Sequence, residues 1–147
     1  MALEEDIRTL SETPLLDQLG RDAQRLIAFS ADRVRLAEGD VLFREGERSD
    51  CGYVIASGAL RLDRAAGGER TVGPATLVGE LALVADVARP ATATAAEPTE
   101  CLRIARDQFA RLFDEYPDLA RNLHARLAAR VQANVAELKS IEALLRR

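Results

Sequence analysis

A glycine, a carboxylate and an arginine lie close together in the middle of this sequence, at a spacing that suits the binding of an anion. Residues 77–84 read Leu-Val-Gly-Glu-Leu-Ala-Leu-Val, and Arg89 follows Glu80 by nine residues. The segment Gly-Glu-Leu-Ala-Leu that begins at Gly79 predicts the end of a strand and one helical turn, whose first amides have no acceptor within the helix. Gly79 lets an anion approach the backbone closely, and Arg89 can neutralise a phosphate by a forked contact.

The carboxylate of Glu80 needs a separate explanation, because an acidic side chain beside a phosphate would repel it. An acidic residue in such a site commonly accepts a hydrogen bond from a sugar hydroxyl. We therefore expect Glu80 to bind ribose and Arg89 to bind phosphate. The alternative is an ordinary turn with an Arg–Glu pair on the surface.

The elements that must position this turn are short strands. Between residues 32 and 104, short apolar stretches are separated by glycines at short intervals, which indicates an antiparallel sandwich or roll. Arg61, Asp63 and Arg64 alternate with Leu60 and Leu62, as in a strand with one wet face. The predicted strands are residues 34–36, 41–43, 53–56, 59–62 and 102–104.

Helices are predicted on both sides of the roll. Residues 13–30 show apolar residues at three- and four-residue steps, with Ser11 or Thr13 as a possible N-cap and a possible break near Gly20. A short helix follows the roll and ends near Pro117, and residues 118–147 contain no glycine or proline, which predicts one long helix.

The long helix carries a seam of mainly apolar residues at alternating steps of four and three. Such a seam favours dimerisation through residues 127–145, because a helix of this length would overhang so small a domain. The alternative is that the stripe packs on the chain's own sheet. The seam residues are Leu127, Val131, Asn134, Leu138, Ile141 and Leu145.

The central segment resembles the phosphate-binding cassette of the cyclic nucleotide-binding family, whose form is Phe-Gly-Glu-Leu-Ala-Leu, a spacer, then Arg, a small residue, Ala and a strand. The resemblance implies that Glu80 accepts the ribose 2′-hydroxyl and that Arg89 pairs with an equatorial phosphate oxygen. It also implies that amides of the turn from Gly79 to Leu81, and that of Ala91, complete the cradle.

The resemblance extends over nearly the whole chain. Residues 38–46 and 53–58 look like the paired-strand motifs of the family, and residues from 116 onward are similar to its bacterial catabolite activator branch. That branch implies that Asn134 reaches the adenine amino group, although Asn134 can equally fix the register of a dimer. Leu62 and Val72 are expected to line the nucleotide pocket.

Three positions depart from the family pattern. Val78 stands where an aromatic residue is usual, and Ala75 stands where glycine is common. Pro90 follows Arg89 where the family often has Ala, Ser or Thr. Because proline offers neither a hydroxyl nor an N–H group, the contact to phosphate or guanine is lost, which favours cyclic AMP over cyclic GMP.

Composition excludes several other functions. The 147 residues carry a net charge of −4, which gives no electrostatic footprint for DNA. Cys51 and Cys101 are expected to be reduced core thiols, and the only histidine, His124, has no partners at metal-ligand spacing. No nucleophile has a recognisable base, so neither catalysis nor a metal is expected.

The predicted location is the cytoplasm. The N-terminus is acidic, unlike a secretory signal, and the longest uncharged run covers only ten residues, 51–60. That run is far shorter than the roughly 20 apolar residues of a membrane-spanning helix, so no membrane association is expected.

The sequence thus predicts a single mainly β domain over residues 1–147, a jelly-roll-like antiparallel β-roll. Helices are expected at 1–31 and 106–147, the roll at 32–105 and the phosphate-binding turn at 79–91. The predicted function is a non-enzymatic, homodimeric cyclic AMP sensor that acts on an unknown protein partner and does not bind DNA by itself. The alternatives are a ligand-free dimerisation scaffold of the same fold and a regulatory fragment of a longer DNA-binding transcription factor.

Overall fold

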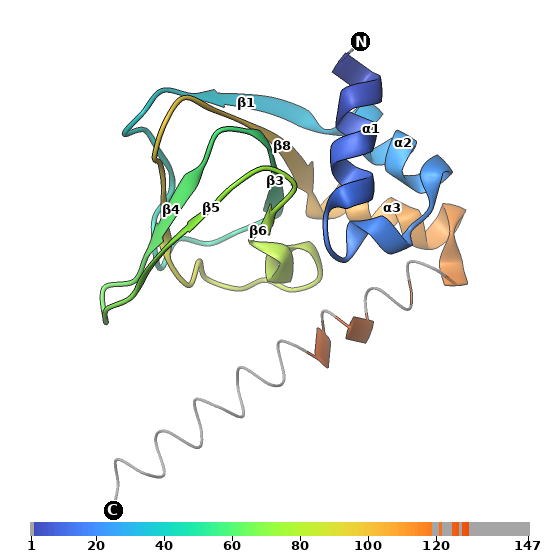
Figure 1. Cartoon of the computed structure of the whole chain (residues 1–147). Helices are drawn as coiled ribbons and strands as arrows, with labels where there is room; N and C mark the ends of the chain where they lie inside the picture. The colour runs from blue at the N-terminus through green and yellow to red at the C-terminus, as the bar shows by residue number, and fades with distance from the viewer. Residues whose placement is uncertain (1, 119–120, 122–124, 127, 130–147) are drawn as a thin grey trace, which may run out of the picture.

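In the computed structural model, which describes residues 2–118, 121, 125–126 and 128–129, eight strands form two four-stranded sheets (Figure 1). Every strand pairing is antiparallel, and the helices gather at one end of the roll. The prediction of a mainly β roll flanked by helices is therefore confirmed for the described part of the chain.

The two sheets are built from strands that are distant in sequence. The first sheet has the order β1 (Asp32–Leu36), β8 (Thr99–Ala105), β3 (Cys51–Ser57) and β6 (Leu77–Val78). The second has the order β2 (Val41–Phe43), β7 (Thr92–Ala95), β4 (Leu60–Asp63) and β5 (Glu69–Val72). Strands β5, β6 and β7 were not among the five stretches predicted as strands, although a strand was expected to end at the Gly79 turn, where β6 lies.

Helix α1 (Ala2–Glu12), the short 3₁₀ helix η1 (Leu16–Gln18) and helix α2 (Arg21–Ser30) precede the roll. Helix α3 (Arg106–Glu115) follows it and ends before Pro117, as predicted. The break expected near Gly20 is confirmed, because Gly20 is the N-cap of α2 and has a φ of 88°.

The prediction that Ser11 or Thr13 caps a helix beginning there is wrong. The hydroxyl of Thr13 donates to the carbonyl of Thr9 at 2.7 Å and thus closes the end of α1. Helix α1 falls within the helices predicted at residues 1–31 but was not separated from the helix expected at 13–30; its buried apolar residues are Ile7 and Leu10.

Two apolar clusters share the central strand β3. Val54 faces the helices, whereas Tyr53 and Ile55 face the interior of the roll, as expected for side chains that alternate across a strand. The cluster at the helical end includes Leu10, Leu16, Ile27, Leu102 and Phe109. The cluster inside the roll includes Phe43, Leu60, Ala93, Cys101 and Val78.

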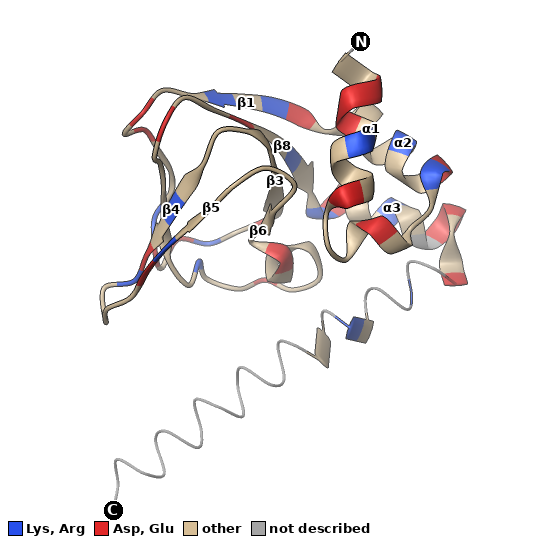
Figure 2. Ribbon diagram, viewed as in Figure 1, with Lys and Arg blue, Asp and Glu red and all other residues tan. Residues whose placement is uncertain are grey.

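Both cysteines are buried and free, as the sequence predicted. Acidic and basic residues are interspersed over the strands and helices that Figure 2 colours. No helix among the described residues is long and apolar enough to cross a membrane. The predicted C-terminal seam, with Asn134 and all its other residues, lies outside the described residues, as does His124.

Candidate nucleotide-binding site

The predicted turn forms between β6 and the short 3₁₀ helix η2 (Glu80–Leu83). Gly79 adopts the left-handed conformation, with φ 77° and ψ 32°, which reverses the chain at the N-cap of η2. The amide of Ala82 donates to the carbonyl of Gly79 at 3.1 Å, and the amide of Ala85 donates to that of Leu81 at 3.0 Å. The first amides of such a turn have no acceptor within the helix and can bind an anion.

The guanidinium of Arg89 lies against this turn. A Cβ atom placed on Gly79 would come within 2.3 Å of Nη1 of Arg89, so only glycine leaves room for the guanidinium here. Arg89 is 5% exposed and therefore points into the protein rather than into solvent. The structure thus brings together the two residues on which the predicted anion site depends.

Three side chains surround Arg89. Its Nη2 donates to Sγ of Cys51 at 3.3 Å, and its Cζ lies 4.3 Å from the ring centroid of Phe43 and 5.7 Å from that of Tyr53. Its Nη1 is a buried nitrogen with no hydrogen-bond partner in the described part of the chain. Because a buried donor without an acceptor is costly, this atom marks a place where an anion is expected.

The backbone around Arg89 is fixed by the loop between β2 and β3. The amide of Arg89 donates to the carbonyl of Glu47 at 2.8 Å, and the amide of Gly46 donates to the carbonyl of Arg89 at 2.8 Å. The hydroxyl of Ser49 donates to the carbonyl of Val87. These bonds set the position from which the arginine side chain enters the roll.

Tyr53 keeps its proton over the physiological range. Burial, together with the interaction with Cys51, raises the pKa of its hydroxyl to about 12. The phenol therefore does not supply a negative charge to Arg89. Tyr53 also stacks on Phe43, with ring centroids 6.0 Å apart and planes inclined by 28°.

Arg106 is a residue of the site region that sequence reasoning missed. From the start of α3 its side chain donates to three backbone carbonyls, those of Ala82 (2.6 Å), Ser49 (2.5 Å) and Ala85 (2.9 Å). It thereby joins η2, the β2–β3 loop and α3. No sequence motif predicts these bonds, because their acceptors are backbone atoms.

The remaining predicted site residues occupy different depths. Ala91 is buried and Pro90 is exposed, while Glu80 and Leu81 on η2 are half-buried. Leu62 on β4 and Val72 on β5 are half-buried and pack against the cluster inside the roll. Their contacts to a nucleotide remain predictions.

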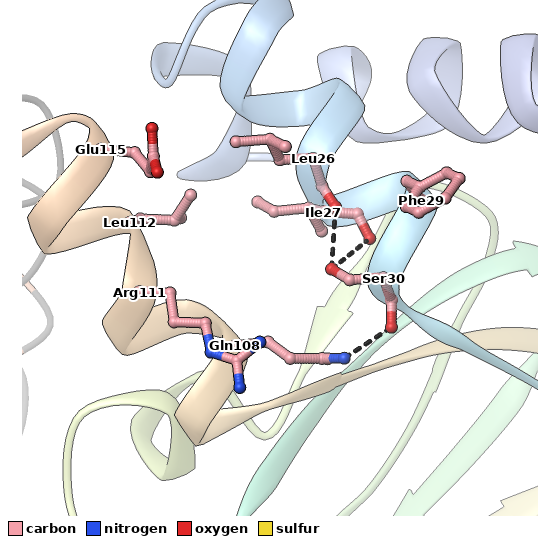
Figure 3. A pocket seen from close by; sticks show the side chains of 8 residues that line it. All are labelled: Leu26, Ile27, Phe29, Ser30, Gln108, Arg111, Leu112 and Glu115. Atoms are coloured by element: carbon pink, nitrogen blue, oxygen red, sulfur yellow. Dashed lines mark hydrogen bonds between the residues drawn. The ribbon is translucent and has the colours of Figure 1, made fainter.

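A hollow lies between α2 and α3 (Figure 3). It shares no residue with the Gly79–Ala91 turn, and Phe29 at its edge is 81% exposed. The side chain of Gln108 donates to the carbonyl of Ser30 across it at 2.6 Å. The lining residues are Leu26, Ile27, Phe29, Ser30, Gln108, Arg111, Leu112 and Glu115. Among the described residues, no group of three or more His, Cys, Asp or Glu could hold a metal.

Comparison with known proteins places this geometry in one family. The profile of the cyclic nucleotide-binding domain matches residues 33–116. The cyclic AMP receptor protein of Thermus thermophilus is 34% identical over 131 residues, which are 86% of this chain and 61% of that protein. The chain thus spans less than two thirds of the length of that protein, and it spans only 7% and 28% of the length of two other curated relatives.

Solved structures agree. A cyclic nucleotide-binding-like protein from Brucella abortus is 38% identical, with a TM-score of 0.65, over 74% of this chain and 97% of that one. The regulatory domain of Toxoplasma gondii PKA, solved with cyclic AMP, is 28% identical, with a TM-score of 0.67, over 74% of this chain and 43% of that one. With the roll, the Gly79 turn and the buried Arg89 in place, the chain belongs to the cyclic nucleotide-binding domain family.

Proposed function

We propose that this chain is a non-enzymatic regulatory module that binds cyclic AMP in the roll, with its phosphate on Arg89 and the Gly79 turn. The observation that carries the proposal is the buried Nη1 of Arg89, which has no acceptor among the described residues and lies against Gly79. A cyclic phosphate supplies one negative charge and acceptor oxygens, which is what this donor and the amides of the turn require.

Glu80 is assigned to the ribose. It begins η2 one residue after Gly79, so a phosphate at the turn places the sugar of the same nucleotide close to its carboxylate. A carboxylate accepts hydrogen bonds from the 2′-hydroxyl and cannot donate to a phosphate oxygen when ionised. Leu62 and Val72 offer apolar surface of the roll to the sugar and base, and the amide of Ala91 adds to the phosphate cradle.

One feature of the chain supports cyclic AMP rather than cyclic GMP. Pro90, directly after Arg89, carries no hydroxyl or amide hydrogen with which to bind phosphate or guanine. The similar proteins do not separate the two ligands, because they include ones named for cyclic AMP and one structure named for a cyclic-GMP-dependent pathway. Asn134 is proposed as the contact to the adenine amino group.

The output of the module is proposed to pass through the C-terminal segment, with homodimerisation by residues 127–145, to a protein partner in the cytoplasm. Arg106 supports this route, because it bonds η2 of the nucleotide turn to the first residues of α3, which leads into that segment. Nucleotide that repositions the turn would then bias the direction in which α3 leaves the roll.

Isothermal titration of the whole chain with cyclic AMP and with cyclic GMP tests the proposal. We expect cyclic AMP to bind at micromolar concentration or below, cyclic GMP to bind more weakly, and Arg89→Ala to lose at least about 100-fold in affinity for cyclic AMP. The matched control is Arg64→Ala, since Arg64 is an exposed arginine on the β4–β5 turn.

Two outcomes contradict the proposal. Absence of heat with either nucleotide at high micromolar concentration, together with an unchanged melting temperature, would favour the ligand-free scaffold. Equal affinity of wild type and Arg89→Ala would show that a nucleotide binds elsewhere. Sedimentation with and without nucleotide measures the proposed dimer independently.

A further inference from the structure

We propose that Cys51 and Phe43 are positioning residues for Arg89, which hold its guanidinium with a thiol and an aromatic face in place of a carboxylate, so that its charge stays available to a ligand phosphate. This inference rests on the proposed function, because it takes Arg89 as the phosphate-binding group. It adds a role for two residues that the nucleotide itself need not touch.

The two residues reach Arg89 from different sheets. Phe43 is the last residue of β2, in the second sheet, and Cys51 is the first residue of β3, in the first sheet. Arg89 enters between them, with its backbone bonded to the loop that connects these two strands. The guanidinium thus contacts one residue from each sheet.

The two contacts use different parts of the guanidinium. The ring of Phe43 lies 4.3 Å from Cζ, and a cation–π contact engages the face of the group while leaving its in-plane N–H donors free. Cys51 accepts from Nη2 at 3.3 Å. Nη1 is left without a partner among the described residues and lies against the turn at Gly79.

The ring of Phe43 is itself held in place. Tyr53, two residues after Cys51 on β3, stacks on it at 6.0 Å between centroids. Both aromatic residues are buried in the cluster inside the roll. The orientation of the guanidinium therefore depends on packed side chains, which are less free to rearrange than an exposed partner.

A carboxylate at the position of Cys51 would act differently. It would form a charge-assisted pair with Arg89, and a phosphate would then have to displace that pair before it could bind. Sulfur is a weak acceptor, so it directs Nη2 without competing strongly for the charge. No carboxylate of the described residues makes an ion pair with Arg89.

Cys51 and Phe43 together form what we call the clamp on Arg89. Four variants test this clamp by titration with cyclic AMP. We expect Cys51→Val, which removes the acceptor and is slightly larger than cysteine, to weaken binding about 5- to 10-fold, and Phe43→Leu to weaken it similarly. Cys51→Ser, which restores an acceptor, should stay within about 3-fold of wild type. Cys51→Asp should weaken binding by about 30-fold or more, because it neutralises Arg89.

The order of these affinities separates positioning from packing. A purely structural role predicts that Cys51→Ser and Cys51→Val differ only in the melting temperature of the ligand-free chain. It also predicts that Cys51→Asp binds cyclic AMP with the same affinity as Cys51→Ser. Affinities of Cys51→Val and Cys51→Asp equal to that of wild type, with Arg89→Ala still defective, would overturn the clamp and leave the proposed function intact.

A measurement without nucleotide keeps the inference testable if the proposed function fails. In ¹⁵N spectra of the arginine side chains, the Nε–H signal of Arg89 is assigned by its loss in Arg89→Lys. We expect slow rotation of the guanidinium in wild type and Cys51→Ser, and faster rotation in Cys51→Val. Equal rotation rates in all three proteins would overturn the clamp.

Discussion

Arg89 is buried and Arg33 is half-buried, and their surroundings differ. Arg33 on β1 bonds both carboxylate oxygens of Asp6 at 2.7 Å and also Glu100 at 2.9 Å, so helix α1 is tied to the sheet by a paired charge. Arg89 bonds one sulfur and faces aromatic rings, and its Nη1 has no acceptor in the described part of the chain.

Arginine therefore serves two different purposes in this molecule. At the helical end, arginine donors are met by carboxylates, which stabilises the fold without a ligand. At Arg89, a donor is buried without an acceptor among the described residues, which lowers the stability of the ligand-free protein and raises the gain on binding an anion. Arg106, whose donors meet carbonyls of η2 and the β2–β3 loop, links these two regions.

After Arg89→Ala, the largest expected effect is that of Gly79→Ala on nucleotide affinity. The added methyl group would lie 2.3 Å from Nη1 of Arg89 at a residue with φ of 77°, so the guanidinium must move. We expect titration to show cyclic AMP affinity reduced about 100-fold, or roughly 2.7 kcal/mol.

Gly67→Ala is the matched control for this change. Gly67 also has a positive φ, 109°, but a Cβ there meets nothing within 4 Å. It should lose about 1 kcal/mol of stability and keep its affinity. Equal losses of affinity in both variants would show that backbone strain, and not the position of Arg89, controls binding.

The next effect concerns stability at the helical end. Arg33→Met leaves Asp6, whose side chain is 11% exposed, without its main partner, and should cost about 2 kcal/mol, or roughly 5 °C in melting temperature. Nucleotide affinity should not change. Arg35→Met is the control, because Arg35 reaches Glu100 from a side chain that is 78% exposed and should cost little. A large loss of affinity in Arg33→Met would show that the Arg33 region also controls nucleotide binding.

The parts of the molecule that sequence reasoning located are those whose signal is local. The Gly79 turn was visible because glycine, glutamate and the later arginine stand at fixed spacing, and the roll was visible from its regular glycines. Ala75 is instructive, because it stands where glycine is common in the family and does adopt a φ of 60°.

The parts that it missed depend on contacts between distant segments. Cys51 and Phe43 lie 38 and 46 positions before Arg89, and only the pairing of the sheets brings them to its guanidinium. Helix α1 was not separated from the rest of residues 1–31 although Leu3, Ile7 and Leu10 stand at steps of four and three, and the bond that ties it to the sheet, from Arg33 to Asp6, joins distant segments. The acceptors of Arg106 are backbone carbonyls, which leave no trace in residue type.

A smaller effect tests whether water is excluded from the apolar cluster inside the roll, to which Cys101 belongs. Burial raises the pKa of Cys101 to about 11, from an ordinary value of 9.0. Because the folded pKa is raised, the stabilising contribution is complete below about pH 9 and is lost as the pH rises towards 11. Between about pH 8 and pH 10.5, wild type should lose about 1–2 kcal/mol more than Cys101→Ala in urea unfolding. Identical losses would mean that water reaches this thiol.

The smallest effect on stability is expected when the buried positive charge of Arg89 is removed. Arg89→Met removes a buried cation that has no carboxylate partner in the described part of the chain, so the ligand-free protein should change by less than about 1 kcal/mol in urea unfolding, and the change should be stabilising. The same substitution at Arg33 should destabilise, because there it leaves a carboxylate unpaired. Nucleotide should then raise the melting temperature of wild type and not that of Arg89→Met, since mass action stabilises only a protein that binds. If Arg89→Met instead unfolds as readily as Arg33→Met, Arg89 is a structural residue of the roll, and the contrast between the two arginines does not hold.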